Sequence, residues 1–322
     1  MKKIIWALLT VGIIASLVGC SSSATSGDGK PSKIVVDYAY YSPTSLVLKD
    51  KGFLEKALEE EGVEVEYVLS QGSNKALEFL NAGSIDFGST AGAASFLAKS
   101  NGSPIEAVYS YSKPEWTALV TTEDSEITKV EDLKGKKVAA TLGTDPYIFL
   151  LRALKDAGLS AKDVEIVNLQ HSDGAAALLN NQVDAWAGLD PHMAKVELGN
   201  NAKLFHRNPD ANTYGILNVR SEFAKQYPEY VDKVIAAYEE AREWAIANPE
   251  ETAALLAEEA GIDLEVAKKQ LERNDFSNSA INDDKKETIL EAGRILQEVE
   301  VVKPSVDVEK TVDELLNDQF TK

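Results

Sequence analysis

The sequence predicts an α/β protein of two lobes with a helical segment at its C-terminal end. Two stretches of the 322-residue chain repeat the same order of strand, helix, strand, helix and strand. The second stretch starts about a hundred residues after the first, and the matching junctions Ile85-Asp86 and Val183-Asp184 lie 98 positions apart. Each βαβαβ unit supplies parallel strands, so two units predict two sheets. The alternative is one large doubly wound sheet.

The first unit begins with an apolar strand signal at residues 34–38. A helical pattern at 45–61, a strand at 63–69 and a short helix at 74–82 follow, and the unit closes with a strand at 85–88. In the second unit the same patterns predict three strands and two helices: strands 136–141, 164–169 and 183–186, and helices 145–157 and 172–181.

Two more strand signals flank the second unit, at residues 117–122 and 214–219, and are placed to be two β crossovers between the lobes. The last third of the chain is helical in pattern and contains no catalytic motif. We therefore expect lobe 1 to contain residues 33–119 plus 217–322, and lobe 2 to contain residues 120–216.

The N-terminus has the pattern of a targeting segment. A basic start and an apolar stretch predict a signal peptide over residues 1–19. The stretch ends Leu17-Val18-Gly19-Cys20, which resembles the bacterial lipobox, and residues 20–32 are small and polar, as in a flexible tether. The chain is therefore expected to be exported and lipid-anchored through Cys20, on the outer face of the cell membrane or on the periplasmic side in a two-membrane cell. The alternative for Cys20 is a buried core position.

Charge and cysteine content exclude several classes of protein. The chain has 33 Lys and Arg against 52 Asp and Glu, and removal of residues 1–19 with their two lysines takes the formal charge from −19 to −21. This balance argues against nucleic acid as a partner. One cysteine forms neither an internal disulfide nor a CxxC metal site. Such an acidic protein must hold any anion locally, with helix N-termini and hydroxyl groups.

Four loops between predicted strands and helices have the composition of an anion or polar-ligand site. Ligands of open α/β sheets collect at the carboxyl ends of the strands, where free backbone N–H groups face the loop. The loops carry hydroxyl side chains or glycine beside a helix start, although each hydroxyl is equally suited to capping its own helix. The loop residues are Tyr40 to Ser45, Ser70 to Ser73, Ser89 to Gly92, and Leu142 to Asp145.

Aromatic and acidic residues near these loops bear on the ligand. Trp116 and Trp186 are placed to wall the apolar part of a ligand, or to pack in the core. Asp145 and Asp190 would repel a bare anion but attract the ammonium group of a zwitterion. The alternative for Asp145 is a residue of the first helical turn.

The sequence does not favour an enzyme. No GxSxG, Walker, GxGxxG or HExxH motif is present, so we expect no catalytic residues, no cofactor and no metal. His171-Ser172-Asp173 contains the residue types of a triad, but as sequence neighbours. A metal site of His171, His192 and His206 matches no ligand spacing. An enzyme would need His171, Asp145 and Asp190 to converge.

Several motifs occur in the order found in one protein family. They include the lipobox, Gln71-Gly72, Gly83-Ser84-Ile85-Asp86, Val130-Glu131-Asp132-Leu133-Lys134-Gly135-Lys136, and Val183-Asp184-Ala185-Trp186 followed by Asp190-Pro191. The set resembles the substrate-binding lipoproteins of ABC importers for aliphatic sulfonates, taurine and nitrate. The resemblance covers essentially the whole mature chain.

The resemblance implies a type II periplasmic-binding fold with two β crossovers. It implies a monomer that presents a small organic anion or zwitterion to an ABC permease driven by an ATPase, and that is not an enzyme. The implied ligand-binding residues are Tyr41, Ser42, Thr44, Ser45, Gln71, Gly72, Thr90, Ala91 and Trp116 in the first part of the chain, and Gly143, Thr144, Asp145, Trp186 and Asp190 in the second.

Two departures from the family pattern leave the ligand open. The first loop contains Pro43, and Asp145 follows Gly143-Thr144 in the second lobe. A thiamine-precursor pyrimidine or another heterocycle is the alternative, since Tyr40 and Tyr41 would suit an aromatic ligand. A scaffold or adhesin that uses the acidic C-terminal helices is a further alternative, and it predicts no closure on a small ligand.

Overall fold

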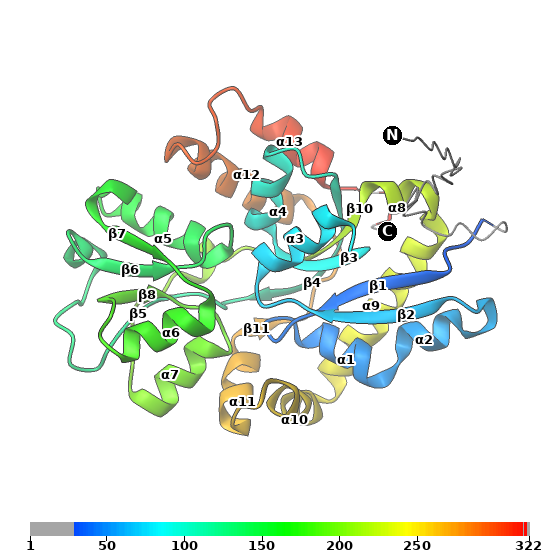
Figure 1. Ribbon diagram of the computed structural model, residues 1–322, viewed down its shortest axis with the longest axis horizontal. Coiled ribbons are helices and arrows are strands. Elements are labelled where there is room, and N and C mark those ends of the chain that lie inside the picture. Colours follow the sequence, from blue (N-terminus) through cyan, green and yellow to red (C-terminus); the bar gives the residue numbers. More distant parts are fainter. Residues whose placement is uncertain (1–28, 318, 321–322) are drawn as a thin grey trace, which may run out of the picture.

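The computed structural model describes residues 29–317 and 319–320. The predicted signal peptide, Cys20 and most of the predicted tether lie outside these residues. The described chain forms two sheets, of six and five strands, that lie beside each other (Figure 1). We call the six-stranded sheet and its helices the first lobe, and the five-stranded sheet and its helices the second lobe.

The first sheet has the strand order β11-β4-β10-β3-β1-β2. Its strands are β1 (Lys33–Tyr38), β2 (Glu64–Leu69), β3 (Phe87–Ala91), β4 (Ile105–Pro114), β10 (Gly215–Arg220) and β11 (Asn274–Asp275). The second sheet has the order β7-β6-β8-β5-β9. Its strands are β5 (Leu119–Thr121), β6 (Lys137–Ala140), β7 (Glu165–Asn168), β8 (Ala185–Ala187) and β9 (Lys203–His206).

The helices cover both faces of each sheet. In the first lobe α4, α12 and α13 lie on one face and α1, α2, α9 and α10 on the other; in the second lobe α5 lies opposite α6 and α7 (Figure 1). Their bounds are α1 (Pro43–Lys51), α2 (Phe53–Leu58), α3 (Ser73–Ala82), α4 (Gly92–Ser100), α5 (Asp145–Asp156), α6 (His171–Leu179), α7 (His192–Asn200), α8 (Ser221–Gln226), α9 (Pro228–Ala247), α10 (Pro249–Ala260), α11 (Leu264–Glu272), α12 (Asp283–Glu298) and α13 (Val308–Leu315). Within the described residues no helix is long and apolar enough to cross a bilayer.

The two predicted βαβαβ units are confirmed. β1 pairs in parallel with β2 and β3, and β6 pairs in parallel with β7 and β8. The chain passes from the first sheet to the second between β4 and β5 and returns between β9 and β10. The two-lobed α/β fold with two β crossovers and a helical C-terminal segment is therefore confirmed, and the single large sheet is wrong.

The repeated Asp of the two units has the same structural role in each lobe. The Asp86 carboxylate accepts a hydrogen bond from the Val35 backbone N–H at 2.8 Å, and the Asp184 carboxylate accepts one from the Lys137 N–H at the same distance. Each Asp thus ties the entry of the third strand of its unit to the first strand. The repeat in the sequence reflects this shared requirement of two units of three parallel strands.

Two differences from the predicted elements have an identifiable physical cause. The helix expected at 45–61 is divided into α1 and α2, because Gly52 adopts a left-handed conformation with φ 64°. The strand β4 was not predicted, since nearly all of its residues are buried on both faces and no alternation of apolar and polar residues marks it.

Candidate functional site

The carboxyl ends of the parallel strands in each lobe lead into helix N-termini at the boundary between the lobes. Gly72 precedes α3 in the first lobe, and a Cβ placed on it would lie 3.0 Å from Nε2 of His171, the first residue of α6 in the second lobe. A Cβ placed on Gly143 would lie 4.0 Å from the Cβ of Asn74. The loops of the two lobes therefore meet across a closed cleft.

Two hydroxyl groups at the start of α1 have no hydrogen-bond partner within the described chain. Ser42 is the N-cap residue of α1 and Thr44 lies in its first turn, and both side chains are fully buried. Buried hydroxyls are normally hydrogen-bonded, so an unpaired pair at a helix N-terminus suits an anion. By contrast, Ser45 is satisfied locally, because its hydroxyl accepts from the Ala39 N–H and donates to the Ser42 carbonyl oxygen.

The other predicted residues of the first lobe take part in internal hydrogen bonds or lie at the rim. The Thr90 hydroxyl contacts Ser95 and accepts from the Asn218 amide at 2.7 Å, and the Ala91 N–H donates to the Ser73 hydroxyl at 3.0 Å. The structure thus places Thr90 and Ala91 in the framework of the cleft. Gln71 is exposed at its edge.

In the second lobe, Asp145 links α5 to both crossovers. Its carboxylate accepts hydrogen bonds from the Trp116 indole N–H at 2.9 Å, the Thr213 N–H at 3.0 Å and the Thr213 hydroxyl at 2.8 Å. Burial raises the pKa of the Asp145 carboxyl, and these hydrogen bonds oppose the shift. Thr144 caps its own loop by donating to the Thr141 carbonyl oxygen at 2.7 Å, and Gly143 supplies a left-handed turn with φ 77°.

A cavity of about 150 Å³ lies between the lobes beside these loops. Tyr41 and Gln71 line it from the first lobe, and His171 and Asp190 line it from the second. The Tyr41 ring packs edge-on against Trp116 with ring centroids 5.9 Å apart. His171 was not predicted as a ligand-binding residue, although its place after β7, at the start of a helix, follows the same positional rule as the four predicted loops.

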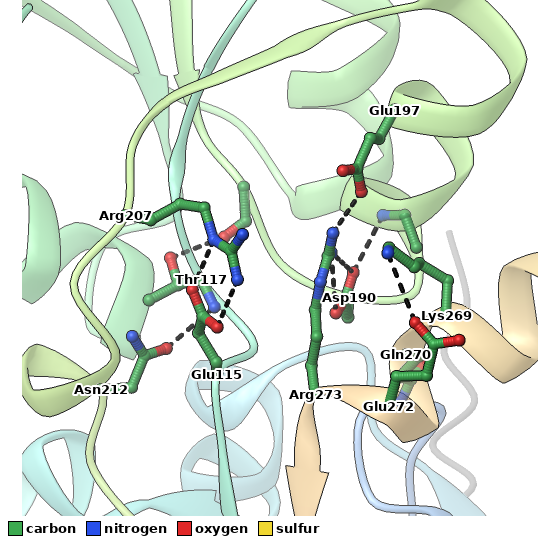
Figure 2. Close-up of polar contacts among 12 residues, drawn as sticks. Glu115, Thr117, Asp190, Glu197, Arg207, Asn212, Lys269, Gln270, Glu272 and Arg273 are labelled. Carbon is green, nitrogen blue, oxygen red and sulfur yellow. Dashed lines mark hydrogen bonds and ion pairs between the residues drawn. The ribbon is translucent and has the colours of Figure 1, made fainter.

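Asp190 connects the second lobe to the C-terminal helices. Figure 2 shows the Arg273 side chain, at the end of α11, between the carboxylates of Asp190 and Glu197. The Arg273 guanidinium lies 3.4 Å from both carboxylate oxygens of Asp190. Burial raises the pKa of Asp190 to about 6, and Arg273 moderates this shift. In the same view Arg207, after β9, binds Glu115, after β4, through two hydrogen bonds.

Trp186 is placed in the core of the second lobe. Its side chain is 1% exposed, and a Cβ on Gly174 of α6 would lie 2.6 Å from its indole nitrogen. The ring therefore packs between β8 and α6. Residues 29–317 contain no cluster of His, Cys, Asp or Glu placed to hold a metal ion, and His206 packs against Phe149 with ring centroids 5.5 Å apart.

Beneath the cavity, Asp37 joins the ends of the three parallel strands of the first lobe. It lies on β1, and its carboxylate accepts from the Ser70 hydroxyl at 2.5 Å and from the Ser89 N–H at 2.7 Å. Burial raises the pKa of Asp37 to about 7, because these neutral donors offset only part of the desolvation.

Replacing Asp37 by asparagine is expected to remove part of the pH dependence of stability. The folded-state pKa of about 7 lies above the ordinary 3.8, so between these pH values the folded state binds more protons than the unfolded chain. The free energy of unfolding therefore falls as the pH rises through this window. Between pH 5 and pH 8 the wild-type chain should lose about 2 kcal/mol more than Asp37→Asn, measured by urea unfolding. An equal loss of unfolding free energy between pH 5 and pH 8 in the wild type and in Asp37→Asn would contradict this prediction. Asp50→Asn, which changes an exposed carboxylate, is the control.

Residues 44–252 match the family model described as NMT1/THI5 like, which is more than half of the chain. The chain belongs to the NMT1/THI5-like family. It is 28% identical over 310 residues to a putative aliphatic sulfonates-binding protein of Bacillus subtilis, with 95% of this chain and 93% of the relative covered. It is 30% identical over 251 residues to a putative aliphatic sulfonates-binding protein of Escherichia coli, with 77% and 78% covered.

This member of the NMT1/THI5-like family also resembles solved structures. The alkanesulfonate-binding protein SsuA of Xanthomonas axonopodis pv. citri, bound to MOPS, superposes with a TM-score of 0.81 at 22% identity, and the match covers 88% of this chain and 98% of that one. The similarity to this structure extends over both lobes. The named relatives are binding proteins, which confirms the family predicted from the motifs.

Proposed function

We propose that the chain is the solute-binding component of an ABC importer, which captures a small organic anion of the aliphatic sulfonate type between its lobes and delivers it to a permease. The observation that carries this proposal is the pair of buried, unpaired hydroxyls of Ser42 and Thr44 at the start of α1. Three sulfonate oxygens can accept from such hydroxyls and from free N–H groups of a helix N-terminus. The sulfonate-binding relatives support the same ligand class.

We propose a narrower set of ligand-binding residues than the sequence predicts. Ser42 and Thr44 hold the anion, and Gly72, Gly143 and Thr144 allow the loops to close. Tyr41, packed against Trp116, walls the cavity. Thr90, Ala91, Asp145 and Trp186 act as the framework around them. Ser45 holds the backbone of the first loop through its two hydrogen bonds. Gln71 lies at the edge of the cavity, and Asp190 lies on its far side.

We further propose the cellular setting and the extent of the lobes. The protein is exported as a monomer, anchored to the membrane by acylated Cys20 and linked to its body by the tether 20–32. Lobe 1 then comprises residues 33–119 and 217–322, and lobe 2 residues 120–216. Labelling with a radioactive fatty acid, lost in Cys20→Ser, would test the anchor.

Calorimetric titration of the purified chain is expected to show binding of alkanesulfonates that depends on the two hydroxyls. Hydrogen bonds to a charged group are the strong ones, so the variant with Ser42→Ala and Thr44→Val should bind at least roughly tenfold more weakly. Thr288→Val is the matched control, because it removes a hydroxyl that bonds only within the C-terminal helix α12. Binding of a pyrimidine with no response to any sulfonate would replace the sulfonate with a heterocycle and keep the receptor class.

A further inference from the structure

The end of α11 connects the first lobe to the second through one side chain. α11 is fixed on the first lobe, because Ala267 shares a buried apolar cluster with Leu46 of α1 and the Gln270 amide donates to the Tyr40 carbonyl oxygen at 2.7 Å. The following strand β11 pairs with β4 of the first sheet. Arg273 lies between α11 and β11, so its backbone belongs to the first lobe while its side chain reaches the second (Figure 2).

Arg273 and its partner Asp190 are attached to neighbouring residues of the first crossover. The Glu115 N–H donates to the Arg273 carbonyl oxygen at 2.7 Å, and the Asp190 N–H donates to the Trp116 carbonyl oxygen at 3.0 Å. Arg273 therefore moves with the first lobe and Asp190 with the second, and the crossover passes between the two attachment points. A rotation of the lobes about this point changes the position of Asp190 relative to Arg273.

The Arg273 guanidinium binds two carboxylates of the second lobe at once. It lies 3.4 Å from both carboxylate oxygens of Asp190, and it donates to the carboxylate of Glu197. Asp190 precedes α7 and Glu197 lies within it, so the guanidinium meets both carboxylates only at one angle between the lobes. The closed cleft provides this angle.

Burial distinguishes this contact from a second ion pair between the lobes. Arg152 of α5 binds Glu291 of α12 at 2.7 Å, with side chains that are 22% and 51% exposed. The side chains of Arg273 and Asp190 are 6% and 1% exposed. An exposed pair contributes little, whereas the loss of one partner of a buried pair leaves the other charge out of water and unpaired. The contact of Arg273 is therefore the one that can decide the position of the lobes.

We propose that Arg273 is a positioning residue that holds the lobes closed, and that it raises the affinity for every ligand of the cleft by the same factor without contacting any of them. The inference rests on the proposed function and concerns the regulation of the same site. Asp190 lines the cavity, whereas Arg273 does not. A contact that stabilises the closed state favours all ligands that bind this state. Without the guanidinium the Asp190 carboxylate would be buried and unpaired in the closed state, while water would solvate it in an open cleft.

The test compares the wild-type chain with Arg273→Met by calorimetric titration of two ligands, ethanesulfonate and butanesulfonate. Both should bind at least roughly thirtyfold more weakly to the variant, and the ratio of the two affinities should stay that of the wild type. Arg152→Gln is the matched control, because it removes an exposed ion pair between the same lobes, and it should weaken binding by less than about fivefold. Arg273→Lys keeps the charge without the planar fork and should give an intermediate affinity.

A second readout needs no ligand. Spin labels attached through Glu78→Cys on α3 and Ala176→Cys on α6, in a chain with Cys20→Ser, report the separation of two helices that begin at the cleft. Double electron–electron resonance of the ligand-free chain should show a larger share of long distances in Arg273→Met than in the wild type or in Arg152→Gln. If Arg273→Met does not fold, Glu197→Gln removes one of the two ion pairs and should move affinity and distance in the same directions by smaller amounts.

Three results would overturn the inference and leave the proposed function standing. They are a loss of affinity in Arg273→Met no larger than in Arg152→Gln, a changed ratio between the two sulfonates, and equal distance distributions with and without the guanidinium. If neither sulfonate binds to the wild-type chain, the proposed function is contradicted, and the distances in the ligand-free chain still decide whether Arg273 holds the lobes closed.

Discussion

Replacing Asp145 by alanine is expected to lower the free energy of unfolding by about 3 kcal/mol or more. The carboxylate is 3% exposed and accepts three hydrogen bonds, from the Trp116 indole and from the Thr213 N–H and hydroxyl. Alanine would leave these donors buried and unpaired, at a cost of about 1 to 3 kcal/mol each. Part of this cost is offset, because the variant no longer has to bury a carboxylate. Because Trp116 and Thr213 lie in the two crossovers, the same change should loosen the connection between the lobes.

The measurement is urea unfolding followed by tryptophan fluorescence and by circular dichroism. The matched control is Asp156→Ala at the exposed C-terminal end of the same helix α5, which should change the free energy of unfolding by less than about 0.5 kcal/mol. A loss of stability for Asp145→Ala no larger than that of the control would show that the hydrogen bonds at the crossovers do not stabilise the fold.

Replacing Gly72 by alanine is expected to weaken ligand binding by at least roughly tenfold while leaving the folded chain stable. The backbone of Gly72 is extended, with φ 160°, so alanine fits it without strain. The added Cβ would lie 2.8 Å from Oδ1 of Asn74 and 3.0 Å from Nε2 of His171. The Asn74 atom is the end of a flexible side chain in the same lobe and can turn away in either state. His171 belongs to the opposite lobe, so its contact with the methyl group destabilises the closed state alone. Binding loses affinity because only the closed state contacts the ligand from both sides.

Calorimetry of the variant with the tightest-binding sulfonate gives the affinity, and thermal unfolding without ligand gives the stability. Gly199→Ala is the matched control, because a Cβ at that position in α7 meets open space. A Gly72→Ala chain that binds like the wild type would show that the approach of Gly72 to His171 is not required for binding.

The architecture was predictable because each βαβαβ unit carries its own local signals. The apolar strands, the glycines that end helices and the Asp before each third strand are short-range features, and Asp86 and Asp184 have the hydrogen bonds that explain their repetition. The strand β4 was missed because its central serines, such as Ser110, are buried among apolar residues. Their partners on β10 lie about a hundred residues away, so no local pattern reveals them.

The positions of the loops at the cleft were predictable, but whether each of their side chains is hydrogen-bonded or unpaired was not. Ser42 and Thr44 have unpaired hydroxyls, whereas Thr90 is bonded to Asn218, which lies 128 positions further along the chain. Asp190 meets Arg273 across 83 positions, and Nδ1 of His171 meets the Thr141 hydroxyl across 30. A sequence predicts which residue types reach a cleft, while the partner that satisfies or frees each one is set by tertiary packing.

Small-angle X-ray scattering of the purified chain tests most directly whether two lobes close on a bound sulfonate. The radius of gyration should fall when the tightest-binding sulfonate is added at saturation, and in Gly72→Ala the same addition should produce a smaller change. A sulfonate that binds by calorimetry without any change in the radius of gyration would contradict closure between the lobes. If no sulfonate gives either a calorimetric binding signal or a fall in the radius of gyration, the proposed receptor function itself would be contradicted.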